Sequence, residues 1–298
     1  MKKETKKIVW FSISSFFAGI LFCIGGILLI VHFANKSTQV ERIKLLQSTA
    51  YNDTIDGNAP QFTYQSATDT DLVRVRVSFN LDSIAGDGDE ISKIKNLMYY
   101  VHNTIVHDGY NSAAGIDKNS IDLVKYCKET GKGVNCRMLA TILNEYYLSM
   151  GFYSRFVVCL PQDSTDTDCH VVNIVYSQTL DKWIMMDPTF AAYVTDKENN
   201  LLNLEEIRTH LINGLPLILN KDANRNHKTK QTVDYYLKTY MAKNLYWLEC
   251  PTESGFATES KDRDSLVYVR LCPVKYTGFH HYGNDYITNN TSYFWQKP

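Results

Sequence analysis

The sequence has no excess of charge of either sign. Its 298 residues include 31 Lys and Arg and 32 Asp and Glu, a net charge of −1, which is too little positive charge for a surface that binds nucleic acid. Glycine and proline are few, at 15 and 7 residues, which excludes a collagen-like chain. Because 44% of the residues are apolar, a disordered chain is also excluded. We therefore expect a globular protein with no nucleic-acid partner.

One segment lacks charged residues altogether. Residues 8–34 contain no Asp, Glu, Lys or Arg, and as a helix they would rise roughly 40 Å, more than a hydrocarbon core of about 30 Å. Lysines precede this segment and only Lys36 closely follows it, which favours a cytoplasmic N-terminus. We predict a cytoplasmic tip and transmembrane anchor over residues 1–36, single-pass in the cell membrane, with the body extracytoplasmic. A cleaved signal peptide is disfavoured because His32 stands where cleavage needs a small residue.

The rest of the chain divides into three parts. Residues 37–71 are polar and end in small and acidic residues, which predicts a stalk. From Leu72 to Leu81 apolar and polar residues alternate, the pattern of a half-buried strand, and we expect the main core to begin there and to extend over 72–220. A basic linker then leads to a C-terminal β-rich extension within 221–298, whose strands are predicted at Leu245–Cys250, Leu266–Val274 and Ser292–Trp295.

A cysteine stands at the predicted start of an amphipathic helix. Asn135 is a suitable helix cap, Cys136 follows it, and an apolar face continues to Met150, after which Gly151 ends the helix. The N–H groups and the positive dipole end of the first turn favour a thiolate, the form that attacks an acyl carbon. We interpret Cys136 as a candidate nucleophile. The alternative is a small buried core residue.

A predicted hairpin brings a histidine and an aspartate together. If its loop covers residues 177–180, Tyr176 pairs with Asp181 and His170 therefore lies opposite Asp187. Cross-strand partners have Cβ atoms roughly 4.5 to 5.5 Å apart, close enough for a carboxylate to orient an imidazole. A surface ion pair is the alternative. A thiol, an imidazole and an orienting acid are together the parts of a cysteine acyl-transfer site.

The sequence resembles the transglutaminase-like family, a branch of the papain-like cysteine-enzyme superfamily. The resemblance runs roughly from Ile91 to Tyr193, in matching order and spacing, and is carried by Gly133-Val134-Asn135-Cys136, Gly151-Phe152-Tyr153-Ser154-Arg155, His170 and Trp183-Ile184-Met185-Met186-Asp187-Pro188-Thr189. It implies an α+β, papain-like/transglutaminase-like catalytic core. In that core Cys136 would be the nucleophile, His170 the base and acid, and Asp187 the orienting acid.

The resemblance also implies a function. It implies a cysteine enzyme that acts on amide bonds through a thioester, as a protease, an amidase or a transglutaminase-type acyl transferase. Together with the predicted anchor, this gives a membrane-anchored extracytoplasmic enzyme. The substrate would be a protein, a peptide or a cell-wall peptide, and no cofactor is implied. Val172 and Arg137 depart from the residues common in the family, which leaves the substrate class open. The alternative is a catalytically silent surface module that binds a protein or a wall polymer.

Several polar residues near the predicted site allow more than one interpretation. An oxyanion hole needs a second donor besides the backbone N–H of Cys136, and the upstream candidates are Asn103, His107 and Tyr110. Cys159 and Cys169 flank a polar loop, where they either form a disulfide in an oxidising exterior or remain separate buried thiols. With His170 they do not have the spacing of a zinc site, and we expect no metal.

Overall fold

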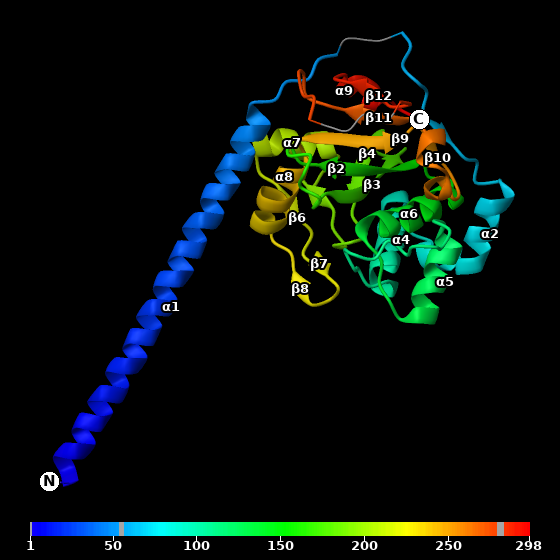
Figure 1. Ribbon diagram of the computed structural model, residues 1–298. Helices are drawn as coiled ribbons and strands as arrows, with labels where there is room; N and C mark the ends of the chain where they lie inside the picture. The colour runs from blue at the N-terminus through cyan, green and yellow to red at the C-terminus, as the bar shows by residue number, and fades with distance from the viewer. Residues whose placement is uncertain (1, 54–56, 279–282) are drawn as a thin grey trace.

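A long helix, α1 (Lys2–Gln47), projects from an α+β body (Figure 1). The computed structural model describes residues 2–53, 57–278 and 283–298, with the backbone alone for 2–19, 21, 22 and 28. The predicted membrane span, residues 8–34, lies within α1, and the side chains of many of its residues are outside this description. Among the described residues, no helix combines the length and apolarity needed to cross a membrane, so the predicted transmembrane helix finds no support there.

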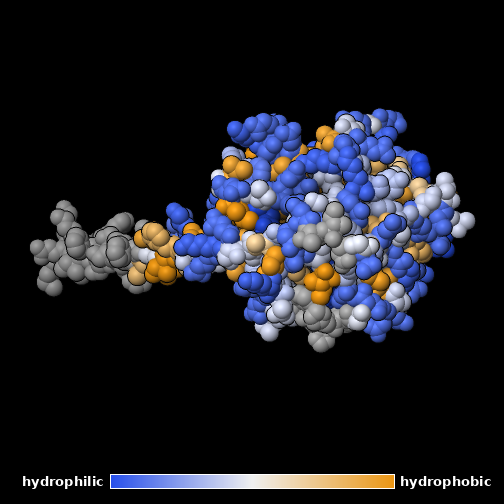
Figure 2. Space-filling view, turned by 90° about the horizontal axis from the view of Figure 1, so that it is seen from above, coloured by the Kyte–Doolittle hydropathy of each residue, from blue (hydrophilic) through white to orange (hydrophobic). Residues whose placement is uncertain are grey.

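The exposed surface differs between the helix and the body. Figure 2 shows the viewed face of the body as mostly hydrophilic, with small separate hydrophobic patches, and shows hydrophobic atoms on the described part of the projecting helix. There Ile27, Ile30 and Phe33 are 61%, 70% and 62% exposed. Large apolar side chains are therefore gathered on the projecting part of α1.

One six-stranded sheet forms the centre of the body. The strands β2 (Ser154–Leu160), β3 (His170–Ser177) and β4 (Lys182–Met186) are an antiparallel meander. β9 (Trp247–Pro251) pairs with β2, and β11 (Tyr268–Leu271) pairs with β9. The strands predicted as a C-terminal extension therefore continue the sheet that carries His170. In spatial order the strands are β12 (Tyr286–Thr288), β11, β9, β2, β3 and β4.

Helices cover both faces of this sheet (Figure 1). Successive residues of a strand point to opposite faces, and in β3 Val175 packs with one helical layer whereas Ile174 packs with the other. The first layer is formed by α4 (Glu90–Thr104), α5 (Ser120–Thr130) and α6 (Cys136–Ser149). The second is formed by α7 (Leu204–Asn213), the π-helix η1 (Val233–Met241) and α8 (Ala242–Asn244).

Short elements complete the fold. One of them, α9, stands where the sequence predicts a strand over Ser292–Trp295; the side chain of Asn290 accepts from the N–H of Tyr293 at 2.9 Å and starts a helical turn instead. The others are α2 (Thr70–Phe79), α3 (Leu81–Ala85), η2 (Thr258–Ser260), η3 (Arg263–Ser265), and the strand pairs β1 (Thr63–Tyr64) with β10 (Glu253–Ser254), β5 (Val194–Thr195) with β6 (Ile218–Leu219), and β7 (Asn224–Arg225) with β8 (Thr229–Lys230); α9 covers Thr291–Phe294.

The segment predicted as the first strand of the core is helical. Residues 72–79 lie in α2 and Leu81 begins α3, so the strand prediction is wrong. The side chain of Asp69 caps α2 by accepting a hydrogen bond from an N–H of its first turn. Leu72 and Val75 are buried whereas Val77 is 74% exposed. Helical spacing, and not the alternation, therefore selects the residues that face the core.

A buried arginine on β2 ties distant segments to the sheet. Arg155 is 1% exposed, and its guanidinium carbon lies 3.9 Å from the ring centre of Phe62 and 4.6 Å from that of Trp183. Its Nη2 also donates to the backbone oxygen of Phe294 at 3.0 Å. These cation–π contacts and this hydrogen bond attach Phe62 and Phe294, which lie near the two ends of the body's chain, to the sheet. The segment around Phe62, expected in a stalk, is thus packed against the sheet.

A buried carboxylate links the stability of this fold to pH. Glu145, on α6, is 1% exposed and accepts hydrogen bonds from the backbone N–H groups of Ser120 at 2.7 Å and Ala257 at 2.9 Å. Burial outweighs these hydrogen bonds and raises the pKa of Glu145 from 4.5 to about 7. The fold therefore prefers the protonated carboxyl group near neutral pH.

We expect the free energy of unfolding to fall as the pH rises from 4.5 to about 7 and to change little from this cause above that. Because the pKa is raised in the folded state, the contribution of Glu145 is complete below 4.5 and is lost as the group ionises. The shift corresponds to about 3 kcal/mol. Urea unfolding from about pH 5 to about pH 9 should show this loss in the wild type and a weaker pH dependence in Glu145→Gln. Parallel curves for the two proteins would contradict it.

Candidate active site

Cys136 is the first residue of α6, as the sequence predicts. The side chain of Asn135 accepts a hydrogen bond from the N–H of Met138 at 3.1 Å and caps the helix. Cys136 is partly exposed as a residue. It lies at the helix end where N–H groups have no intrahelical acceptor and where the dipole favours negative charge.

The loop before Cys136 is packed closely against the segment that follows α4. A Cβ at Gly133 would lie 2.2 Å from the carbonyl oxygen of Val106, so only glycine fits there. Because the two segments lie so close, the N–H of Val134 donates to the carbonyl oxygen of Val106 at 3.0 Å. Val134 and His107 are thereby paired in a β-bridge. The bridge places His107 beside the chain that leads into Cys136.

His170 and Asp187 form a buried ion pair. Nε2 of His170 lies 2.7 Å from Oδ2 of Asp187, and the two side chains are 1% and 0% exposed. The hairpin register differs from the predicted one, because Tyr176 pairs with Trp183 rather than with Asp181. A slip of two residues keeps every side chain on its face. Asp187 therefore becomes a diagonal neighbour of His170 and remains within reach of it.

Four contacts hold the carboxylate of Asp187. Oδ1 accepts hydrogen bonds from the N–H groups of Thr189 at 2.8 Å and Phe190 at 3.3 Å. Oδ2 faces His170 and accepts from the hydroxyl of Tyr236 at 2.7 Å. Burial would raise the pKa of Asp187, but the charge of His170 and these hydrogen bonds lower it below its usual value. Burial would likewise lower the pKa of His170, but Asp187 raises it to about 10.

The thiol of Cys136 is acidic. Burial would raise its pKa, but interactions with the imidazoles of His107 and His170 and with the backbone N–H of Val171 lower it from 9.0 to about 6. Nδ1 of His170, the ring nitrogen that does not face Asp187, is buried and has no hydrogen-bond partner in the described part of the chain. This nitrogen is therefore available to the thiol, and the site can hold a thiolate beside an imidazolium.

Of the three upstream candidates for the oxyanion hole, His107 is the one that lies beside Cys136. Asn103 and Tyr110 are exposed to solvent. The backbone of His107 is fixed by Asn226, whose Oδ1 accepts from its N–H at 2.8 Å and whose Nδ2 donates to its carbonyl at 2.9 Å. Asn226 lies in the turn between β7 and β8, a segment interpreted from the sequence as a linker.

Aromatic residues that sequence reasoning missed surround His170. Its ring centre lies 5.4 Å from that of Phe190 and 5.1 Å from that of Tyr240. The hydroxyl of Tyr240 donates to the backbone oxygen of Cys169 at 3.2 Å, which holds the start of β3. Tyr240 and Tyr236 both lie on η1. The signal for them in the sequence is the helical spacing of apolar residues, which does not indicate a role in the site.

Arg137, which departs from the residue common in the family, makes contacts that hold parts of the fold together. Its Nη1 lies 3.0 Å from Oε2 of Glu259 and 3.4 Å from the hydroxyl of Tyr268. Its guanidinium carbon also lies 5.7 Å from the ring centre of Phe156 on β2. The residue after Cys136 thus connects α6 to the C-terminal part of the chain.

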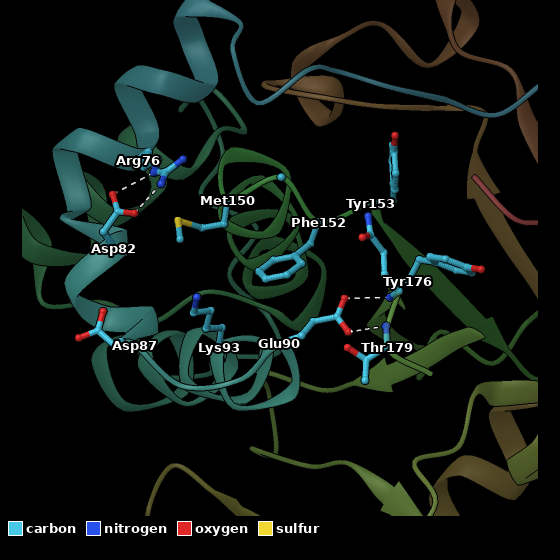
Figure 3. A pocket seen from close by; sticks show the side chains of 13 residues that line it. Arg76, Asp82, Asp87, Glu90, Lys93, Met150, Phe152, Tyr153, Tyr176 and Thr179 are labelled. Atoms are coloured by element: carbon cyan, nitrogen blue, oxygen red, sulfur yellow. Dashed lines mark hydrogen bonds and ion pairs between the residues drawn. The ribbon is translucent and has the colours of Figure 1, made fainter. Parts of the chain in front are cut away.

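A large cavity on the body lies away from this site. It has a volume of about 550 Å³ and opens between α2, α3, the start of α4 and the turn from β3 to β4 (Figure 3). Its lining includes none of the predicted site residues. Arg76 pairs with Asp82, and Glu90 accepts from the N–H groups of Gln178 and Thr179. These charged groups already have partners within the protein, so they do not indicate a bound ligand.

The remaining cysteines do not form a second site. Cys159 and Cys169 are free thiols, and Cys159 pairs with His170 across β2 and β3 rather than with Cys169. The alternative of two separate thiols therefore describes the structure. Among the described residues, no group of His, Cys, Asp and Glu side chains is arranged to hold a metal ion.

The chain was found to be similar to known proteins in part of its length. Residues 78–188 match the family model of the transglutaminase-like superfamily, and no curated protein matches the chain. A solved structure described as a putative cysteine protease from Cytophaga hutchinsonii has 10% sequence identity and a TM-score of 0.31, over 57% of this chain and 62% of that one. Residues 78–188, which contain Cys136, His170 and Asp187, are a transglutaminase-like superfamily domain.

Proposed function

We propose that the protein is a cysteine enzyme that acts on amide bonds through a thioester on Cys136. The observation that carries this proposal is the arrangement at the start of α6. There the thiol has a pKa of about 6 beside an imidazole whose other nitrogen lies 2.7 Å from a buried carboxylate. The transglutaminase-like domain around these residues supports the same class of chemistry.

In the first half of the reaction Cys136 replaces the amine of the substrate. The thiolate attacks the amide carbon, a C–S bond forms, and the carbonyl electrons move onto oxygen. The N–H of Cys136 and the imidazole of His107 are the groups that we assign to this oxyanion. As the C–N bond breaks, His170 gives its Nδ1 proton to the leaving amine. The products are a thioester and a free amine.

In the second half the acyl group leaves the enzyme. Neutral His170 takes a proton from water or from an amine as it attacks the thioester carbon, the C–S bond breaks, and the thiolate of Cys136 returns. Asp187 remains ionised and orients the imidazole throughout. Water gives hydrolysis, as in a protease or amidase, and an amine gives acyl transfer. We propose a protein, a peptide or a cell-wall peptide as substrate, since each presents amide bonds.

We also propose that this enzyme is anchored in the cell membrane with its body outside the cytoplasm. The uncharged run over residues 8–34 and the lysines before it support this location. The exposed apolar side chains on the projecting part of α1, such as Ile30 at 70%, support it as well, because contiguous apolar surface indicates contact with a membrane or a protein.

The reactivity of the thiol tests the proposed chemistry. The rate at which iodoacetamide alkylates Cys136 should rise through about pH 6 and then stay constant, because the thiolate is complete above its pKa. Cys127 is a matched control in the same chain, since it is also partly exposed but burial raises its pKa. Peptide mapping by mass spectrometry distinguishes the two. Cys136→Ala should lose the fast reaction with little change in Tm.

Turnover completes this test. Release of peptides from labelled casein measures hydrolysis, and incorporation of a labelled primary amine into casein measures transfer. Asp187→Asn should keep the thiol but misorient His170, so turnover should fall on the order of a thousandfold. If Cys136 reacts no faster than Cys127 and both variants bind a surface ligand as the wild type does, the protein is the silent binding module and not an enzyme.

The role of His107 predicts a change in the thiol and in the rate. His107→Ala should raise the pKa of Cys136 above about 6, because one of the groups that lower it is removed, and kcat should fall roughly tenfold or more. The pH dependence of alkylation and the steady-state kinetics measure both effects. Asn103→Ala, at the exposed end of α4, is the matched control and should behave as the wild type. An unchanged pKa and kcat in His107→Ala would remove His107 from the site.

The proposed location predicts how intact cells respond to added protease. Protease outside the cells should degrade the body, because the body is expected on that side of the membrane, and immunoblotting against the C-terminal part measures the loss. A cytoplasmic protein of the same cells is the control and should persist. Protection of the body from protease, or a mature soluble form whose N-terminus lies near Asn35, would contradict the anchored arrangement.

A further inference from the structure

The π-helix η1 contributes a buried tyrosine to the site. The hydroxyl of Tyr236 donates to Oδ2 of Asp187 at 2.7 Å, and the same oxygen faces Nε2 of His170 at 2.7 Å. Tyr236 is completely buried. Burial, together with the charge of Asp187, holds the pKa of Tyr236 well above its ordinary value. The hydroxyl therefore stays protonated and remains a donor to the carboxylate.

This hydrogen bond restrains the oxygen that the imidazole uses. Oδ1 of Asp187 is held by the N–H groups of Thr189 and Phe190, which belong to the turn that follows Asp187 itself. The contacts described for Oδ2 are with His170 and with Tyr236. Tyr236 comes from a segment 49 residues further along the chain. Its hydroxyl thus adds a long-range restraint on the plane of the carboxylate, which local turn geometry does not provide.

The neighbouring titratable groups do not replace this contact. Cys159 and Tyr240 are close enough for Asp187 to raise their pKa values, after the larger effect of burial. The hydroxyl of Tyr240, however, donates to the backbone oxygen of Cys169 at 3.2 Å. Cys159 remains a buried thiol, which is a weak donor. Of these side chains, Tyr236 is thus the one whose hydroxyl group donates a hydrogen bond to Asp187.

The position of η1 is itself fixed from outside the site. Nε2 of Gln39, on α1, donates to the backbone oxygen of Asp234 at 3.1 Å and to Oγ1 of Thr239 at 3.2 Å. Arg42, one turn later on α1, donates to the backbone oxygen of Thr239. The last turns of α1 therefore hold the helix that presents Tyr236.

We infer that Tyr236 is a positioning residue, whose hydroxyl holds the carboxylate of Asp187 in the orientation that His170 needs. The inference rests on the proposed function, because it assigns Tyr236 to the same catalytic site. Tyr236 does not touch the reacting atoms and acts through Asp187. The contact between α1 and η1 is then part of the support of the catalytic acid, and not only of the fold.

Deleting one hydroxyl tests this inference. In Tyr236→Phe, kcat should fall roughly tenfold or more, the scale expected when a hydrogen bond to a charged group is lost, while KM changes by less than about twofold. The pKa of Cys136, measured from the pH dependence of its alkylation, should rise above about 6, because an imidazolium with a less fixed partner stabilises the thiolate less. Tyr235→Phe is the matched control, since Tyr235 is the preceding residue on η1 and is 54% exposed.

The outcomes separate this inference from a structural role and from the proposed function. A lower Tm with unchanged kcat and an unchanged pKa of Cys136 would show that Tyr236 contributes only to the packing of the core, and would overturn the inference. If Tyr236→Phe does not fold, Arg42→Ala is tested instead, with Lys44→Ala, which alters an exposed residue of α1, as its control. Arg42→Ala should lower kcat and raise the pKa of Cys136 relative to this control. Equal values for the two variants would overturn the inference. If wild-type Cys136 reacts no faster than Cys127, the proposed function itself fails.

Discussion

The buried pair between His170 and Asp187 is the interaction on which the rest of the site depends. Removing two ionised groups from water costs several kcal/mol for each group unless partners replace the lost hydration. Here both oxygens of Asp187 have donors, from the following turn, from His170 and from Tyr236. The acidity of Cys136 follows from this pair, since a charged imidazole next to the thiol favours the thiolate. Burial lowers the pKa of His170, and Asp187 is the stronger of the two groups, with Cys136, that oppose this effect and keep the imidazole charged.

The central sheet brings the two halves of the site together. Cys136 arrives on α6, which packs on one face, and Tyr236 arrives on η1, which packs on the other. His170 lies between them at the first residue of β3. The strands that follow η1 continue the same sheet, so the C-terminal part of the chain shares its sheet with His170. The hydrogen bond from Tyr236 to Asp187 therefore comes from outside the region that matches the superfamily model, residues 78–188.

The last turns of α1 connect the projecting helix to this support. Gln39 and Arg42 contact η1, and Leu46 is completely buried against the body. Under the proposed membrane location, the segment that leaves the bilayer also braces η1, the helix whose Tyr236 donates to Asp187. On the other side of the site, Asn226 fixes the backbone of His107 through two hydrogen bonds. Both supports join residues more than 100 positions apart in the chain.

Local patterns in the sequence were sufficient for the start of α6 and for the hairpin that carries His170 and Asp187. A helix cap, a glycine stop and a turn act over a few residues, so their physical causes lie within the segment itself. The exact register of the hairpin was decided by the tertiary structure. The helix at residues 72–79 was decided in the same way, because the apolar residues of this segment fit both a strand and a helix, and packing against the core selects the helical face. Tyr236 and Asn226 were found only in the tertiary structure, since hydrogen bonds between distant residues leave no periodicity that a sequence can show. The tertiary structure also selected His107 from the three candidates that the sequence offered.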